Sequence, residues 1–292
     1  MEKTSKNKEL ISLVSLIDEP DDRIYEQIKD KILSYGLEVI PVLENVWENS
    51  FDNVIQQRIE TIIHTIQFDN VFDELKKWML FQKHDLLRGF LLVTKYQYPD
   101  LDEEKIIKEI GKISQDVWLE LNKNLTALEN VKVFNHILYD LHGFRGNKKN
   151  FHAPQNMYIN NVLESKKGNP LSLSIIYSVI AQSLKIPVYG VNLPEYFILA
   201  YTKDFVKESS RKLYEAEVLF YINAFNKGAV FSINELNYFI KQLKLEPEKR
   251  YFVPCNNVEI IQRLIFSLIS SYEKLGYPDK VKELEKLRTA LD

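Results

Sequence analysis

Apolar residues recur at every third or fourth position through most of the chain, which is the spacing of amphipathic α-helices. Two helices are predicted between residues 8 and 35, separated by an acidic turn at 18–21, and the second ends at Gly36. The same pattern returns between residues 39 and 66. Two similar helical hairpins in tandem predict an α-solenoid-like arrangement, with an irregular helical bundle as the alternative.

Helical periodicity continues from residue 70 to 118 and again from 127 to 141, where a glycine-containing polar segment breaks it. The segment GLEVIPVLENV at residues 36–46 resembles the Gly-x-x-x-Ile-Pro sequence that starts helices in HEAT-type repeats. We therefore predict a HEAT-like helical domain over residues 1–119.

The stretch from residue 158 to 201 has the most specific local pattern in the chain. Gly168, Asn169 and Pro170 end one element and start the next, because asparagine is a good N-cap and proline fits the first helical position. The helix that follows is apolar on most of its faces, which predicts that it is buried. Its first turn carries Ser172 but no cysteine.

Short β-like runs follow this helix and predict a small sheet. Two strands are expected at residues 188–193 and 196–201, on either side of a turn at Pro194, and a third at 215–222. A helix followed by antiparallel strands is the arrangement in which papain-like and transglutaminase-like enzymes carry their catalytic residues.

The chain returns to helix after the sheet. Ser232 and Glu235 have the spacing of a capping box, which predicts a helix from 232 to 243. A last helical pair is predicted between residues 257 and 291. One hairpin is too little for a free-standing repeat array, so we expect it to pack on the core or to offer a groove to a partner.

Composition narrows the functional classes. The net charge of −3 gives no global field that would favour nucleic acid or an anionic membrane. Cys255 is the only cysteine, which excludes an intramolecular disulfide, and neither His64 nor His84 is followed by a second ligand four positions later. No metal or cofactor is therefore expected. A charged N-terminus and the lack of a long apolar run predict a cytoplasmic protein.

Several motifs together resemble the transglutaminase-like core of the bacterial SirB-type family, which carries a tetratricopeptide-like C-terminal region. They are GFRGN at 143–147, KGNPLSL at 167–173, GVNLP at 190–194 and FYINAFNKG at 220–228. The resemblance covers about residues 120–292 and implies a core at 120–250 and a helical hairpin at 251–292. We interpret its key motif positions as structural: Gly168, Asn169, Pro170, Gly190 and Pro194.

The resemblance also implies where a catalytic triad would lie. A working enzyme of this type would carry cysteine near Pro170–Ser172, histidine at the position of Tyr196 and aspartate at that of Asn223. Tyrosine is a poor general base at neutral pH, and an asparagine amide cannot stabilise an imidazolium by charge. A serine with neither base nor carboxylate is inert, so we predict a vestigial cleft formed by Ser172, Tyr196 and Asn223.

Two alternatives remain open. His142, His152 or Cys255 could rebuild a nucleophile site, which would make the protein an amide hydrolase or acyltransferase of the papain-like clan. The polar trio of Ser172, Tyr196 and Asn223 could instead form the pocket of a small-ligand sensor.

A basic loop lies beside these motifs, and nearby Glu164 and the overall acidity favour a solvated face over a nucleic-acid contact. Its members are Arg145, Lys148, Lys149, Lys166 and Lys167.

The sequence therefore predicts an α+β, predominantly α fold. It has an α-solenoid-like N-terminal domain, a transglutaminase-like core and a C-terminal hairpin. The predicted function is a non-enzymatic cytoplasmic scaffold that binds a protein or peptide, with no nucleic-acid or membrane partner.

Overall fold

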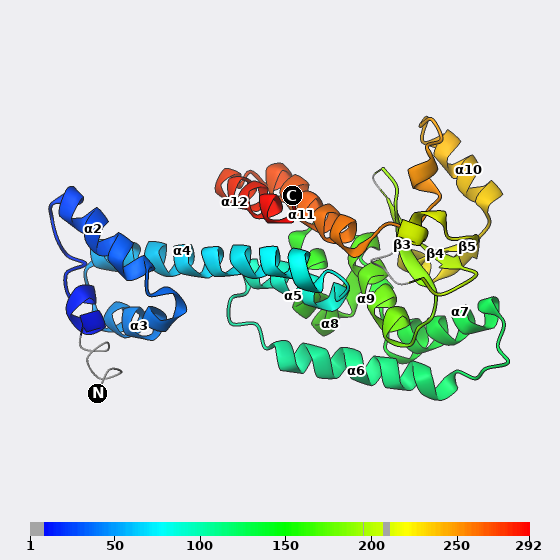
Figure 1. The fold of residues 1–292 in the computed structure, drawn as a ribbon, viewed down its shortest axis with the longest axis horizontal. Coiled ribbons are helices and arrows are strands. Elements are labelled where there is room, and N and C mark those ends of the chain that lie inside the picture. Colours follow the sequence, from blue (N-terminus) through cyan, green and yellow to red (C-terminus); the bar gives the residue numbers. More distant parts are fainter. Residues whose placement is uncertain (1–8, 195, 207–210) are drawn as a thin grey trace. The chain divides into compact units, whose positions relative to one another are not determined.

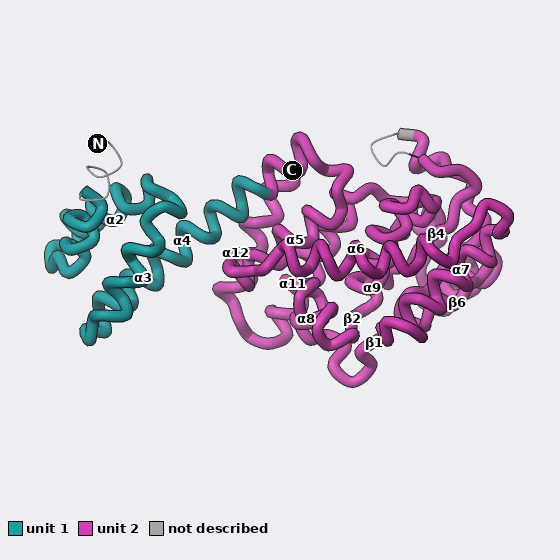
Figure 2. Tube along the Cα trace, turned by 90° about the horizontal axis from the view of Figure 1, so that it is seen from below, with its two compact units in different colours: residues 1–74 teal, residues 75–292 magenta. Residues whose placement is uncertain are grey.

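The computed structural model describes residues 9–194, 196–206 and 211–292. The fold is α+β and predominantly helical, as the sequence predicts (Figure 1). The chain divides into two compact units, residues 1–74 and residues 75–292 (Figure 2). This division lies within a helix, whereas the predicted domain limits at residues 119 and 250 stay predictions.

The first unit is a small helical assembly with its own apolar core. Residues 9–14 are helical, followed by α2 (Asp22–Leu33), α3 (Ile40–Asn49) and α4 (Asn53–Lys77), which extends past the unit limit. Asp21 caps α2, because its side chain accepts hydrogen bonds from the N–H groups of Arg23 and Ile24. The core consists of branched apolar side chains from each helix, and the most deeply buried are Ile32, Val39, Leu43, Ile59 and Ile62.

The second unit contains most of the helices and all the described strands. The longer helices are α5 (Leu86–Gln97), α6 (Glu103–Glu120), α7 (Ala127–Asn135), α8 (Ile159–Ser165), α9 (Pro170–Ser183), α10 (Ile233–Gln242), α11 (Asn257–Leu275) and α12 (Pro278–Arg288). Shorter helical turns are η1 (Gly36–Val39) in the first unit and η2 (Trp78–Gln82), η3 (His136–Leu141), η4 (Pro154–Met157), η5 (Arg211–Glu215), η6 (Ala224–Asn226), η7 (Lys249–Tyr251) and η8 (Thr289–Leu291) in the second.

The main sheet is antiparallel, with strand order β3-β4-β5-β6. Its strands are β3 (Val188–Asn192), β4 (Phe197–Thr202), β5 (Val218–Asn223) and β6 (Ala229–Phe231). Two shorter strands that precede them in the chain, β1 (Arg145–Gly146) and β2 (Lys167–Gly168), pair in parallel as a separate small sheet. The three predicted strands are present, but Glu215 lies in η5 rather than at the start of β5, and the sequence analysis missed β6.

The sheet separates two packed layers. Ile198 and Ala200 join a core cluster with Leu236 and Ile240 of α10. Because side chains alternate along a strand, Leu199 faces the opposite side, where α9 contacts β3 and β4. This explains why α9 is apolar on most of its faces: it lies between the sheet and the helices α5 and α6.

A close contact between α5 and α11 is built on a glycine. A Cβ atom at Gly89 would lie 2.7 Å from the Trp78 ring and 2.9 Å from Ile261. The Trp78 ring is fully buried, and its Nε1–H donates to the carbonyl of Asp85 at 2.7 Å. Asn257 in the first turn of α11 adds hydrogen bonds to the carbonyls of Lys83 and His84. These contacts fix the start of α11.

Two features are absent from the part of the chain that the structure describes. None of the described helices is both long and apolar enough to cross a membrane. The same residues contain no cluster of three or more His, Cys, Asp or Glu side chains with the geometry to hold a metal ion.

Candidate functional site

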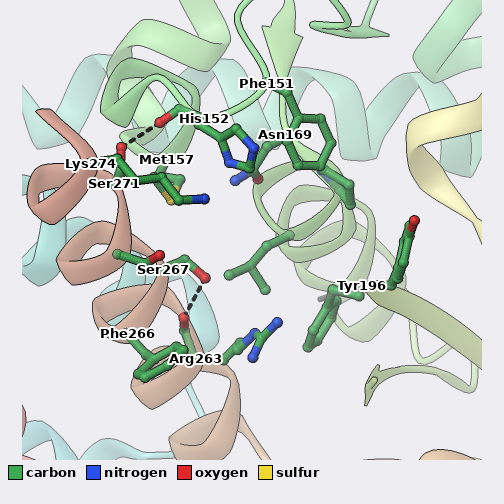
Figure 3. Close-up of a pocket in the computed structure, with 14 residues that line it drawn as sticks. Phe151, His152, Met157, Asn169, Tyr196, Arg263, Phe266, Ser267, Ser271 and Lys274 are labelled. Carbon is green, nitrogen blue, oxygen red and sulfur yellow. Dashed lines mark hydrogen bonds between the residues drawn. The ribbon is translucent and has the colours of Figure 1, made fainter. Parts of the chain in front are cut away.

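A cavity of about 670 Å³ lies where the N-terminus of α9, the start of β4 and one side of α11 meet (Figure 3). We call it the α9–α11 cavity. Its volume is in the range of ordinary ligand sites. The residues that line it are Phe151, His152, Met157, Asn169, Pro170, Leu171, Tyr196, Phe197, Arg263, Phe266, Ser267, Ser270, Ser271 and Lys274.

The N-terminus of α9, which borders this cavity, is held by a hydrogen-bonded cap. The Asn169 side chain accepts from the N–H of Ser172 at 2.8 Å, and the Ser172 hydroxyl accepts from the N–H of Asn169 at 3.1 Å. Pro170 occupies the first turn, as predicted. A Cβ atom at Gly168 would lie 2.5 Å from the Ser172 hydroxyl oxygen, so the glycine permits this cap.

The three predicted cleft residues do not share one cavity. Ser172 is fully buried, its hydroxyl belongs to the cap, and it is not among the described residues that line the cavity. Asn223 is likewise absent from that lining, and its side-chain oxygen accepts from the N–H of Asn226 to cap η6. Tyr196 does line the cavity, with its ring packed edge-on against Phe239 at 4.9 Å between centroids.

Replacement of Ser172 with alanine tests this structural role. We expect the free energy of unfolding to fall by about 1–2 kcal/mol, because the buried Asn169 N–H loses its acceptor. Ligand binding to the α9–α11 cavity should change less than twofold, since the Ser172 side chain is not part of its lining. Urea denaturation measures the first effect, and a Ser172→Ala variant as stable as the wild type would contradict the role.

The histidines and the cysteine lie in different places. The Nε2 atom of His142 is 2.8 Å from the Asp116 carboxylate on α6. His152 lines the α9–α11 cavity, and its backbone carbonyl accepts from the Ser271 hydroxyl. Cys255 lines a second cavity of about 370 Å³ and donates its N–H to the carbonyl of Gly190. Neither cavity, within the described residues, combines a cysteine with a histidine.

Helix α11 supplies cavity residues that the sequence analysis did not single out. Arg263, Ser267, Ser270, Ser271 and Lys274 line one side of the cavity, and Figure 3 shows His152, Asn169 and Tyr196 across from this side. Their spacing follows the helical period, so they share one face of α11. A signal was present in the sequence, because three serines at this spacing interrupt the apolar pattern of the helix.

Hydrogen bonds of two buried tyrosines join α11 to elements on the side of the helix away from the cavity. The hydroxyls of Tyr158 and Tyr272 are 3.1 Å apart, and Tyr272 also donates to the Gln97 side chain of α5. Burial raises the pKa of both phenols above the ordinary value, so they stay neutral hydrogen-bonding groups. Together with the Ser271–His152 hydrogen bond, they fix the position of α11 beside η4.

The charged side chains among the described lining residues are cationic. Arg263 and Lys274 line the cavity, and no Asp or Glu occurs among the lining residues that the structure describes. The N-terminus of α9 adds the positive end of a helix dipole through Asn169, Pro170 and Leu171. By contrast, in the basic loop Lys166 pairs with Glu109.

Comparison with known protein families identifies the superfamily of the second unit. Residues 104–266, more than half of the chain, match the transglutaminase-like superfamily. The chain belongs to the transglutaminase-like superfamily. The match runs from α6 into the first half of α11, so it leaves out part of the cavity lining. The lining residues beyond it are Ser267, Ser270, Ser271 and Lys274. The SirB-type assignment and the HEAT-like and tetratricopeptide-like interpretations of the flanking helices stay predictions.

Several relatives share part of this transglutaminase-like chain. Human F-box only protein 21 is 28% identical over 182 residues, which are 62% of this chain and 27% of that protein. A UPF0162 protein of Xylella fastidiosa is 32% identical over 115 residues, 39% of this chain and 41% of that protein. Another from Vibrio cholerae is 24% identical over 196 residues, 65% and 67% of the two chains.

The matched region thus corresponds to only about a quarter of F-box only protein 21. No solved structure gives a significant match to the chain.

Proposed function

We propose that this transglutaminase-like protein is a non-enzymatic, cytoplasmic binding module, and that the α9–α11 cavity holds an extended segment of a partner protein. The main support for the proposal is where the structure places the residues at the expected triad positions. The Ser172 hydroxyl is part of the helix cap and is buried there. Tyr196, the residue at the position where the family resemblance implies a catalytic histidine, lines the cavity. Among the described residues that line the cavity, no cysteine accompanies His152.

Covalent catalysis requires a nucleophile within hydrogen-bonding reach of a base. Two of the three cavity serines are engaged with backbone carbonyls: the Ser267 hydroxyl donates to the carbonyl of Arg263, and the Ser271 hydroxyl donates to that of His152. A phenol such as Tyr196 is a poor proton acceptor at neutral pH. These contacts favour binding over hydrolysis or acyl transfer.

The shape of the cavity supports a peptide ligand. The short serine side chains of α11 form one part of the lining, and apolar groups from Met157, Leu171 and Phe197 form a second surface. Backbone amides of an extended segment can hydrogen-bond to hydroxyls, while its apolar side chains pack on the second surface. Aromatic groups at the rim, Phe151, Tyr196 and Phe266, are residue types that anchor protein ligands.

A cavity-filling substitution tests the proposal. A random-peptide display library is selected on the wild-type chain, and the enriched peptides are measured by fluorescence anisotropy. We expect Ser270→Trp to weaken their binding at least tenfold, because the indole fills space in the cavity that Ser270 lines. Ser15→Trp, at an exposed position of the first unit, is the matched control and should bind as the wild type does.

Circular dichroism establishes that both tryptophan variants are folded. The proposal fails if selection enriches no peptide, or if the enriched peptides bind Ser270→Trp and the wild type equally well.

A further inference from the structure

The two units of the chain carry opposite net charges. Residues 1–74 contain 16 Asp and Glu residues and 7 Lys and Arg residues, a net charge of −9, whereas residues 75–292 contain 25 and 31, a net charge of +6. No lysine or arginine occurs from residue 32 to residue 57, a stretch that includes all of α3 and the turn to α4. The charged side chains of this stretch are therefore all anionic.

Arg58, the first basic residue after this stretch, is committed to the packing of the first unit. It donates hydrogen bonds to two backbone carbonyls in the segment before α2, and its guanidinium lies 3.8 Å from the centre of the Tyr25 ring. Glu44 and Glu48 are both exposed and lie one turn apart on α3, where like charges repel each other. A positively charged ligand at this helix would relieve the repulsion.

Three large apolar side chains are exposed at one end of the α3–α4 hairpin. Trp47 lies in the last turn of α3, Phe51 in the connecting turn and Val54 in the first turn of α4, with exposed fractions of 38%, 100% and 57%. The connecting turn is held in place, because the Gln56 side chain donates to the carbonyls of Trp47 and Ser50. A fully exposed phenylalanine contributes no burial to the unit itself, whereas its burial by a ligand would be favourable.

Carboxylates lie among these apolar groups. The Glu60 carboxylate accepts from the indole N–H of Trp47 at 3.0 Å. Asp52 directly follows Phe51 and caps α4 by accepting from the N–H of Val54 at 2.7 Å. Apolar and anionic side chains therefore alternate around this turn. We call them the α3–α4 turn surface: Glu44, Trp47, Glu48, Phe51, Asp52, Val54 and Glu60.

We infer that the α3–α4 turn surface docks a basic segment of a partner protein, in which an apolar side chain lies between lysine or arginine residues. The apolar side chain packs on Phe51 and Trp47, and the cations pair with Glu44 and Glu48. Protein interfaces commonly combine aromatic anchors with a polar rim of complementary charge. The surface lies in the first unit, so the inference goes beyond the peptide site proposed in the second.

The same charges argue against other occupants. A surface with carboxylates and no cation repels nucleic acid and anionic lipid headgroups. A second copy of the chain is the main competitor, because its residues 75–292 carry a net charge of +6. The 31 basic residues of that unit are interspersed with 25 acidic ones, so its charge density is below that of a short basic segment. A separate basic segment is the better match.

The test begins with a random-peptide display library selected on the full-length wild-type chain. Peptides that also bind Phe51→Ser are removed by counter-selection, which discards those held by the α9–α11 cavity. We expect the remaining peptides to carry lysine or arginine on both sides of an apolar side chain. Selection that leaves no enriched peptide, or peptides without an excess of basic residues, would overturn the inference.

Fluorescence anisotropy of an enriched peptide then measures the two kinds of contact. Phe51→Ser should weaken binding at least tenfold, because the aromatic anchor is lost. The double variant Glu44→Gln and Glu48→Gln should weaken it at least fivefold and reduce its dependence on salt, because two charge pairs are lost.

The matched controls lie in the second unit. Phe81→Ser removes a phenylalanine that is 75% exposed, and the double variant Glu120→Gln and Glu285→Gln removes two exposed carboxylates. Both controls should bind the peptide as the wild type does. Circular dichroism and thermal melting show that every variant is folded. Equal weakening by Phe51→Ser and Phe81→Ser would contradict the inference.

Two further measurements separate this surface from other sites. Ser270→Trp should leave binding of the enriched peptide unchanged; if it abolishes binding, the peptide occupies the α9–α11 cavity, and the inference is wrong while the proposed function stands. Sedimentation velocity of the wild-type chain alone tests the second copy. A concentration-dependent dimer that Phe51→Ser abolishes would assign the surface to self-association and overturn the choice of a partner protein.

Discussion

Replacement of Trp78 with alanine is expected to lower the free energy of unfolding by about 3–5 kcal/mol. The Trp78 side chain is fully buried, and the surface beside it is shaped by Gly89, so the lost ring leaves a cavity between α5 and α11. The hydrogen bond from its indole to the Asp85 carbonyl is lost as well. Because α11 forms one side of the cavity, peptide binding should weaken in the same variant.

Trp118→Ala provides the matched control for this prediction. The Trp118 side chain is 62% exposed near the end of α6, and its removal should change stability by no more than about 0.5 kcal/mol. Urea denaturation followed by circular dichroism compares the two variants. Equal losses would show that Trp78 does not have the packing role described above.

The second large effect is expected at Gly228, in the turn between Asn223 and β6. Its φ angle is +68°, and a Cβ atom there would lie 1.8 Å from the side-chain oxygen of Asn135. The Asn135 amide also donates to the Gly228 carbonyl at 2.9 Å, so Asn135 cannot move away without loss of that bond. We expect Gly228→Ala to cost about 2–4 kcal/mol, from left-handed backbone strain and the lost hydrogen bond.

Gly111→Ala is the control with the opposite expected sign. Gly111 lies inside α6, and a Cβ atom there would meet no other atom within 4 Å. Alanine should therefore stabilise the protein by about 0.5–1 kcal/mol through the helix propensity and the smaller backbone entropy loss. Thermal melting of both variants, each against the wild type, tests the pair, and a destabilised Gly111→Ala or a neutral Gly228→Ala would contradict the account.

The local signals in the sequence predicted local structure well. Asn169 and Pro170 start α9 as expected, and Ser232 and Glu235 form the predicted capping box of α10. Both depend on residues only three or four positions apart, which a sequence shows directly. Strand β6 was missed because its three residues follow a turn signal and are too few to show an alternating pattern.

The candidate site was harder to predict because it is built by tertiary contacts. Ser172 stands at the third position after the N-cap, where a side chain bonds back to the cap, and this use was not recognised in the sequence. The pairing of α11 with the start of α9 joins residues about ninety positions apart, and no local pattern indicates which helix closes a cavity. Arg263 and Lys274 were therefore not singled out in the sequence, whereas Tyr196 was.

We expect the α9–α11 cavity of this transglutaminase-like protein to bind a peptide and to catalyse no covalent reaction on it. The most direct measurement incubates the wild-type chain with a glutamine-containing peptide and a primary amine, and follows amine incorporation and ammonia release by mass spectrometry and a coupled assay. The account predicts no product above the protein-free blank. Turnover by the wild-type chain that disappears in Tyr196→Phe, with peptide binding retained, would contradict it.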